Sequence, residues 1–221
     1  MLIKETYSPA CMPTIRLGYA LTLPSDYKEG EQLPMIVFLH GVGERGDDID
    51  RVGATGFARL FMQDPDYGGH RVITLSPQCP ESVIWTNITL ATKELIDTIA
   101  ARYGADRSHI ALTGLSMGGY GTWDLATAFP DFFSCIAPIC GGGITWRAGL
   151  IAHLPIRAFH SEHEQIVICE NSRMMVDAVN ACGGNATLTL YDSADHNCWD
   201  EVYQHTDVIS WLTTAVPEKR V

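Results

Sequence analysis

Residues 108–121 read Ser-His-Ile-Ala-Leu-Thr-Gly-Leu-Ser-Met-Gly-Gly-Tyr-Gly, and this stretch decides the fold. Residues 110–113 are apolar or β-branched, which is typical of a buried strand, and the residues after Ser116 have a pattern typical of a helix. The G-x-S-x-G segment from Gly114 to Gly118 lies between them. This order of strand, motif and helix predicts a nucleophile elbow, a sharp turn that exposes the serine hydroxyl.

The two glycines that frame the motif have a steric reason. A strained turn at Ser116 leaves no room for a Cβ two residues before it or two residues after it, so glycine is needed at 114 and 118. The turn also places the hydroxyl at the N-terminus of a helix, whose free N–H groups favour developing negative charge. We therefore predict that Ser116 is a catalytic nucleophile.

Length and composition bound the class of protein. With 221 residues, of which 46% are apolar and 19% charged, the chain fits one globular domain over residues 1–221. The formal net charge of −11 argues against nucleic acid and against an anionic membrane surface as partners. Nothing in the sequence points to a particular oligomeric state.

Cysteine usage and the start of the chain indicate a compartment. The seven cysteines show no C-x-x-C spacing, which favours neither a disulfide framework nor a zinc ribbon. The first residues lack the basic and apolar regions of a signal peptide, and no apolar run approaches transmembrane length. We therefore expect a cytoplasmic protein that does not bind membranes.

Strand and helix patterns alternate at short spacing along the chain. The expected strands are 14–23 (at an edge of the sheet), 35–39, 72–75, 110–113, 135–139, 156–159 and 186–191. The expected helices are 53–63, 90–103, from the elbow to 129, 171–181 and 201–213. This alternation predicts a mostly parallel α/β sheet with helices on both faces. No long insertion separates the strands at 135–139 and 156–159, so no large lid domain is expected.

A serine hydroxyl needs a base and an acid that orients the base, and with an elbow these follow the serine in the order acid, then histidine. His196 is the best base, because it lies in a polar loop after the last expected strand. His205, on the last helix, and His153, in a connecting loop, are poorer candidates.

The acid is expected after a strand between Ser116 and His196. The segment after 156–159 offers Glu162 and Glu164. Asp192 and Asp195 stay possible, but they lie close to His196 in the same loop.

Ester or amide chemistry also needs N–H donors for an oxyanion. The N–H after the nucleophile, that of Met117, is one candidate. The second is expected in the glycine-rich loop after the strand at 35–39, with Val42 N–H as first choice and Gly41 or Gly43 N–H as alternatives. His40, at the start of this loop, is expected to be structural.

Two tryptophans are candidates for the wall of a substrate pocket. Trp199 follows His196 by three residues, and Trp85 precedes a long expected helix. Tryptophan more often packs in a core or at its rim. Among the tryptophans of the chain, these two have the best chance of contacting substrate.

The sequence gives little support for a metal or a cofactor. His160, Glu162, His163 and Glu164 cluster, but H-x-x-H without further ligands at fixed spacing is a weak zinc signal. No G-x-G-x-x-G follows the first strand, and no Walker lysine is present. We expect no metal and no cofactor.

Several stretches together resemble one group of enzymes. The chain is similar to α/β-hydrolase esterases related to polyhydroxybutyrate depolymerase and feruloyl esterase, a group often described as predicted peptidases or as phospholipase/carboxylesterase-like. The resemblance rests on Gly114–Trp123 (GLSMGGYGTW), Phe129–Asp131 (FPD), Ala137–Gly143 (APICGGG), Leu39–Gly46 (LHGVGERG), Ser76–Pro80 (SPQCP) and His196–Asp200 (HNCWD). These stretches lie within residues 34–212 and are specific for the superfamily, much less so for substrate.

The resemblance implies the α/β-hydrolase fold, with Ser116 as nucleophile, His196 as base, and oxyanion donors at Val42 and Met117. In such proteins the acid sits in a Phe-His-Gly-x-x-Asp-x-x-Val pattern. Residues 159–167 read Phe-His-Ser-Glu-His-Glu-Gln-Ile-Val, which puts Glu164 where aspartate is expected. Glutamate is one methylene longer, so the loop must retreat slightly for its carboxylate to reach the imidazole.

We therefore expect a cofactor-independent serine carboxylesterase that acts through an acyl-enzyme on a small-molecule ester. The resemblance favours acyl groups on sugars or aromatic acids. One alternative is a peptidase or thioesterase with the same triad, because an elbow does not distinguish these leaving groups. Another is a non-catalytic binding protein on a hydrolase scaffold, which only the glutamate at the acid position favours.

Overall fold

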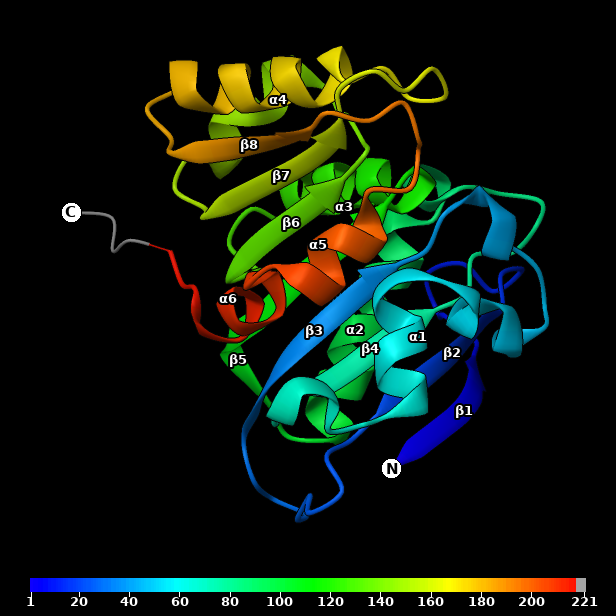
Figure 1. Cartoon of the computed structure of the whole chain (residues 1–221). Coiled ribbons are helices and arrows are strands. Elements are labelled where there is room, and N and C mark those ends of the chain that lie inside the picture. The colour runs from blue at the N-terminus through cyan, green and yellow to red at the C-terminus, as the bar shows by residue number, and fades with distance from the viewer. Residues whose placement is uncertain (218–221) are drawn as a thin grey trace.

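The computed structural model describes residues 1–217, which form one eight-stranded sheet with helices on both faces (Figure 1). The strand order is β1-β2-β4-β3-β5-β6-β7-β8. Antiparallel pairing joins β1 to β2 and β2 to β4, and all other neighbours run parallel. The mostly parallel sheet expected from the sequence is therefore present.

The strands follow the expected apolar runs with small changes at their ends. They are β1 (Leu2–Tyr7), β2 (Leu17–Thr22), β3 (Leu33–Leu39), β4 (Ile73–Pro77), β5 (Ala105–Leu115), β6 (Cys135–Ile139), β7 (Ile156–Ser161) and β8 (Ala186–Tyr191). The α-helices are α1 (Gly56–Gln63), α2 (Thr89–Arg102), α3 (Met117–Ala128), α4 (Glu170–Ala181), α5 (Trp199–His205) and α6 (Val208–Thr214). The connection from β6 to β7 contains a short 3-10 segment, Thr145–Ile151.

Two apolar cores lie on opposite faces of the sheet. Successive side chains of a strand point to opposite faces, so a strand covered on both sides is apolar throughout. In β3, Met35, Val37 and Leu39 enter the core beneath α2, α3 and α4. Ile36 and Phe38 enter the core beneath α1, α5 and α6, the helices nearest the viewer in Figure 1.

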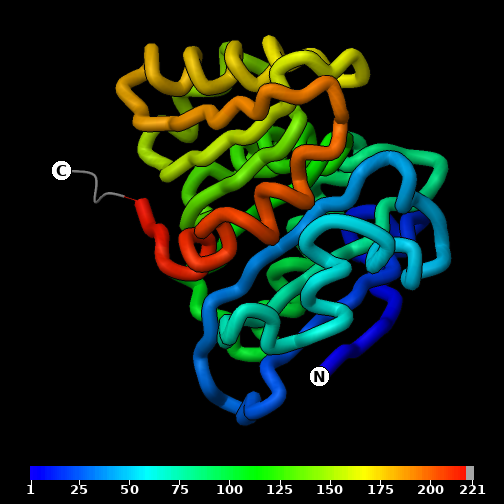
Figure 2. The backbone as a smooth tube through the Cα atoms, viewed as in Figure 1, coloured from blue at the N-terminus to red at the C-terminus, as the bar shows by residue number. Residues whose placement is uncertain are grey.

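The sequence does not predict β1, and it places the next strand wrongly at an edge. In the structure β1 forms the edge, and β2 lies between β1 and β4, as the chain trace in Figure 2 shows. Residues 2–7 read Leu-Ile-Lys-Glu-Thr-Tyr, are exposed or half-buried, and pair only with β2. A strand with so little burial lacks the apolar pattern by which strands are recognised.

Two expected helices have different bounds. The helix expected over 53–63 begins at Gly56, because Ile49–Ala54 form a 3-10 segment. The helix expected over 201–213 is two helices that meet at Thr206, whose backbone is extended. The Thr206 hydroxyl donates to the Val202 carbonyl at 2.6 Å and accepts from the Val208 N–H at 3.2 Å, so it satisfies groups at both helix ends.

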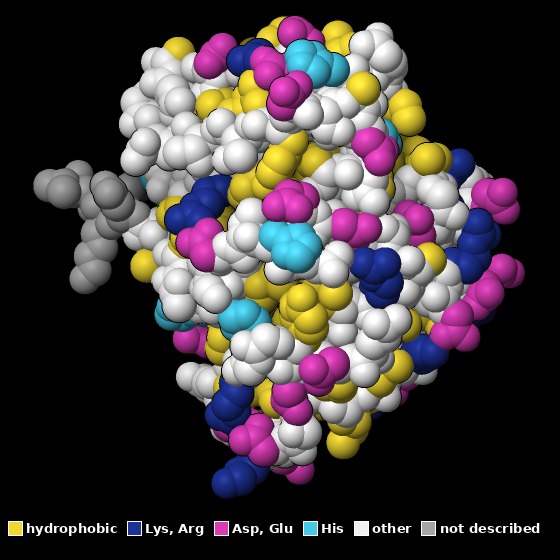
Figure 3. Space-filling model, in the orientation of Figure 1, with side chains coloured by type: hydrophobic (Ala, Val, Ile, Leu, Met, Phe, Trp, Pro, Cys, Tyr) yellow, Lys and Arg dark blue, Asp and Glu magenta, His cyan; other side chains and the backbone are white. Residues whose placement is uncertain are grey.

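Charged side chains of both signs are intermixed on the face shown in Figure 3. Near the surface of the molecule, Arg59 pairs with Asp200 at 3.1 Å and Arg157 pairs with Asp207 at 2.9 Å. Exposed pairs of this kind contribute little to stability, so the two cores carry most of it. Among residues 1–217, none of the helices has the length and apolar character needed to span a bilayer.

Packing of α3 against the sheet predicts a strong dependence on Gly118. A Cβ on this residue would collide with the carbonyl oxygen of Leu39 at the end of β3. We expect Gly118→Ala to cost about 3 kcal/mol or more, as overpacking against backbone does, and to lower Tm by roughly 10 °C. Gly18→Ala is the control, because its Cβ would meet only ordinary contacts, the nearest at 3.6 Å from Gln78. Equal Tm values for the two variants would contradict the prediction.

Candidate active site

Ser116 lies between β5 and α3 in a backbone conformation that few non-glycine residues adopt. Its φ is 54° and its ψ is −117°, and its N–H donates to the carbonyl of Ile139 at the end of β6. A Cβ on Gly114 would collide with the carbonyl oxygen of Gly118. The turn thus has the geometry of the elbow that the sequence predicts, with the serine half-buried at the N-terminus of α3.

Three side chains that are far apart in the sequence form one hydrogen-bonded row. Ser116 Oγ lies 2.9 Å from His196 Nε2, and His196 Nδ1 lies 2.5 Å from Glu164 Oε2. Ser116 follows β5, Glu164 follows β7, and His196 follows β8, so all three come from loops at the carboxyl edge of the parallel strands. The hydroxyl can donate to Nε2 while Nδ1–H donates to the carboxylate, which is the arrangement that general-base catalysis requires.

Among the candidate carboxylates, only that of Glu164 is hydrogen-bonded to His196 in the described structure. Glu164 is 2% exposed, and its Oε2 also accepts from the N–H of Val167 at 3.1 Å. Glu162 instead pairs with Arg173 at 2.9 Å, at the surface. Asp192 pairs with His163, and Asp195 accepts from the N–H of Asn197, as exposed carboxylates do.

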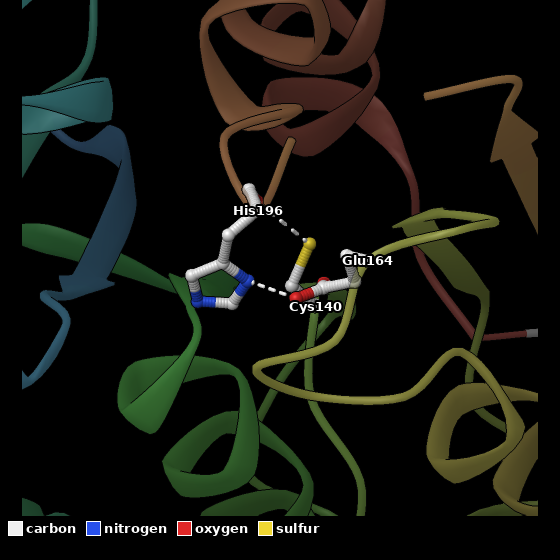
Figure 4. A group of neighbouring side chains, drawn as sticks. All are labelled: Cys140, Glu164 and His196. Carbon is white, nitrogen blue, oxygen red and sulfur yellow. Dashed lines mark hydrogen bonds and ion pairs between the residues drawn. The ribbon is translucent and has the colours of Figure 1, made fainter. Parts of the chain in front are cut away.

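The surroundings of His196 favour its protonated form. Burial acts to lower the pKa of this histidine, but contacts with Cys140 and the negative charge of Glu164 outweigh it and raise the pKa above the ordinary value. Figure 4 shows the Glu164 carboxylate against the imidazole, with the Cys140 thiol beside the His196 backbone. The Trp199 ring stands edge-on to the imidazole, with centroids 5.2 Å apart, and its indole N–H donates to Thr55. Trp199 therefore restricts the tilt of the His196 ring.

The loop after β3 runs beside Ser116. A Cβ on Gly41 would lie 2.9 Å from the end of the Leu115 side chain and 3.8 Å from the Cβ of Ser116, so glycine eases the close approach of this loop to the elbow. Val42 begins a 3-10 turn and Met117 begins α3. The first N–H groups of a helix have no acceptor within it, so both N–H groups are available to a ligand. This geometry suits the oxyanion donors expected from the sequence.

The buried side chain of His40 holds this loop through two hydrogen bonds. Its Nε2 accepts from the Cys79 N–H at 2.9 Å, and its Nδ1–H donates to the Gly41 carbonyl at 2.6 Å. Burial lowers the pKa of His40 to about 4, so the ring is neutral. The side chain of Trp85 packs edge-on against His40 and donates its indole N–H to the His40 carbonyl at 3.0 Å.

A cavity of about 290 Å³ adjoins the elbow and is lined by Ile84, Trp85, Thr86, Met117 and Tyr120. Trp85 lines this cavity but is 1% exposed, so it offers little surface for contact. The sequence reasoning missed three of the lining residues. A helical spacing of four from Ser116 would have indicated Tyr120, because residues four apart share a helix face.

The structure gives little support for a metal at this site. Ligand atoms of Cys140, Glu164 and His196 lie within 4.8 Å of one another. His196 Nδ1 is hydrogen-bonded to Glu164, and contact with Cys198 together with burial raises the pKa of the Cys140 thiol. A metal needs the thiolate and a free imidazole nitrogen, so this donor set does not fit.

The sequence-based zinc candidates do not converge either. Glu162 and His163 pair with other side chains at the surface, whereas His160 and Glu164 are buried. Sequence reasoning also gave no indication of the two buried thiols near His196. Cys140 and Cys198 lie 3.4 Å apart, and neither has a sequence spacing that suggests the contact.

Comparison with known proteins gives a consistent result. Residues 14–178 match a family model described as "Putative esterase", a range that includes Ser116 and Glu164. Poly(3-hydroxyalkanoate) depolymerase C of Paucimonas lemoignei is 40% identical over 115 residues, which are 49% of this chain and 28% of the depolymerase. The chain thus spans less than a third of the length of this relative.

Solved structures agree with this result. A thermostable esterase superposes with a TM-score of 0.87 at 31% identity, over 96% of this chain and 62% of the esterase chain. The feruloyl esterase module from Clostridium thermocellum, solved as an S954A mutant with sinapinate, superposes with a TM-score of 0.78 at 16% identity, over 100% and 90% of the two chains. The expected α/β-hydrolase fold is therefore confirmed, and the chain belongs to the esterase family.

Proposed function

We propose that this protein hydrolyses carboxylic esters through a serine nucleophile and an acyl-enzyme. The observation that carries the proposal is the continuous row of hydrogen bonds from Ser116 Oγ through His196 to Glu164 Oε2, at 2.9 and 2.5 Å. A serine hydroxyl in such a row loses its proton to the imidazole as it attacks a carbonyl carbon. Membership of the esterase family supports an ester as the substrate.

In the proposed reaction the Oγ of Ser116 bonds to the ester carbonyl carbon, and its proton passes to His196 Nε2. The carbonyl oxygen becomes an oxyanion, which accepts hydrogen bonds from the N–H groups of Val42 and Met117. Glu164 stabilises the imidazolium, which then protonates the leaving alcohol as the C–O bond breaks. A water molecule, deprotonated by His196, attacks the acyl-enzyme in the same way and releases the carboxylic acid.

The cavity beside the elbow suggests the size of the acid. Its volume of about 290 Å³ and its lining by Ile84, Trp85 and Met117 suit a small acyl group or one aromatic ring. We propose that the acyl part of the substrate occupies this cavity and that the alcohol part faces solvent.

Replacing the nucleophile tests the proposed mechanism. We expect Ser116→Ala to lower kcat on a p-nitrophenyl ester by roughly 10⁴-fold or more, because removal of the nucleophile abolishes the acyl-enzyme route. Ser108→Ala is the control, since Ser108 is exposed near the other end of β5. Undiminished turnover by the Ser116 variant would exclude the mechanism. Thioester and peptide substrates assayed in parallel would show which acyl donor is preferred.

The pH dependence of kcat/KM tests the acid. His196 must be neutral to accept a proton, and its pKa is raised, so activity should fall as pH decreases through a value above the ordinary 6.5 or so of histidine. We expect Glu164→Gln to lower kcat by roughly 10³-fold or more. It should also move the acid limb to lower pH, because the negative charge that raises the pKa of His196 is gone. An unmoved acid limb would contradict the role of Glu164.

Filling the cavity tests the acyl site. Ile84 is 41% exposed at the cavity rim, so a larger side chain can be placed there without disturbing a core. We expect Ile84→Trp to reduce kcat/KM for esters of aromatic acids by about 10-fold or more. The lost contacts in the pocket should weaken binding of the transition state by about 1–3 kcal/mol. The value for an acetate ester should stay near that of the wild type. A uniform loss on both substrates would show that the acyl group binds elsewhere.

A further inference from the structure

Only one of the two carboxylate oxygens of Glu164 takes part in the row described above. Its Oε2 contacts His196 and the Val167 N–H, whereas its Oε1 is buried and has no hydrogen bond within residues 1–217. Buried carboxylate oxygens without a donor are rare because the loss of hydration is costly. Oε1 lies 3.0 Å from Nε2 of His160, whose side chain is itself fully buried.

His160 is held in place through both of its ring nitrogens. Its Nε2 lies 2.7 Å from the carbonyl oxygen of Val167, and its Nδ1 lies 2.8 Å from Ser172 Oγ on α4. The Ser172 hydroxyl in turn lies 2.8 Å from the carbonyl oxygen of Gly141, just after β6. The imidazole therefore connects the loop that carries Glu164 to a helix and to the end of a neighbouring strand.

The partners of His160 define where its proton lies. The carbonyl oxygen of Val167 and the Oε1 of Glu164 are both acceptors, so Nε2 must carry a hydrogen. The Ser172 hydroxyl has a single hydrogen, so with the ring hydrogen on Nε2 it donates either to Nδ1 or to the Gly141 carbonyl oxygen, each 2.8 Å away. The Nε2–H donates to the Val167 carbonyl at 2.7 Å and also lies beside Oε1, since Nε2 is 3.0 Å from that oxygen.

We propose that His160 is a positioning residue for Glu164, acting on the oxygen that faces away from His196. This inference rests on the proposed function, in which Glu164 orients His196. The Val167 N–H holds Oε2, and the Nε2 of His160, 3.0 Å from Oε1, limits how far the other end of the carboxylate can move, which sets the distance from Oε2 to the imidazole. They do so for a glutamate, whose extra χ angle would otherwise leave the carboxylate less constrained than that of an aspartate.

Glutamine and methionine at position 160 form a matched pair of variants. Both are unbranched and similar in size, but only glutamine has an N–H that can reach the place of Nε2. We expect His160→Met to lower kcat by roughly 10- to 100-fold. This is the range found when a hydrogen-bond partner that orients a functional side chain, such as a metal-ligating residue, is removed. KM should change little, because His160 does not line the cavity. His160→Gln should recover most of the lost kcat.

A double-mutant cycle separates positioning from a general effect on stability. If His160 acts through Glu164, His160→Met should have little further effect on the rate at which a fluorophosphonate labels Ser116 in a Glu164→Gln background. Costs that add in the double variant would overturn the proposal. Equal kcat values for the Met and Gln variants, or a kcat of the Met variant equal to the wild type, would also overturn it.

Two further measurements keep the test decisive. If His160→Met does not give folded protein, as judged by its Tm, Ser172→Ala takes its place and should lower kcat only when Glu164 is present. Ser116→Ala is assayed alongside. Wild-type turnover by Ser116→Ala would refute the proposed function itself, whereas an inactive Ser116→Ala together with equal Met and Gln variants would refute only the role of His160.

Discussion

The left-handed backbone of Ser116 is the constraint on which the rest of the site depends. Such a conformation costs about 1–3 kcal/mol in a non-glycine residue and persists only where its surroundings enforce it. Here the Ser116 N–H is held by the carbonyl of Ile139, and the glycines of the turn let α3 approach the ends of β3 and β6. The strain is thus balanced by packing and hydrogen bonds in the interior of the sheet.

Burial of Glu164 creates a second requirement, which the loop after β7 meets. A carboxylate with a fully buried side chain is stable only if donors replace its lost hydration. The Val167 N–H and His196 supply two of these donors. Burial also strengthens the electrostatic effect of the Glu164 carboxylate on the His196 imidazole, because little water screens the interaction. The burial of Glu164 and the raised pKa of His196 therefore depend on the same few groups.

Sequence reasoning was most successful where a pattern has one physical cause. The elbow needs glycine for steric reasons, and doubly covered strands such as β3 must be apolar throughout, so both could be recognised. β1 could not, because a mostly exposed edge strand has no distinctive periodicity. The break at Thr206 and the contacts of His160 depend on side-chain hydrogen bonds between partners that only the folded chain brings together. The placement of Glu164 beside His196 agrees with the expected pattern, and the roles of the two residues stay predictions.

The position of β8 at the edge of the sheet has a consequence for how the protein would lose activity on heating. β8 is the last strand of the sheet and is paired only with β7, and the loop that carries His196 follows it directly. Edge elements open locally at a lower free energy than the whole molecule unfolds. Fraying of this edge would withdraw the imidazole while Ser116, in the interior of the sheet, keeps its strained turn. We therefore expect thermal inactivation to begin with opening of the β7–β8 edge, before the two cores melt cooperatively.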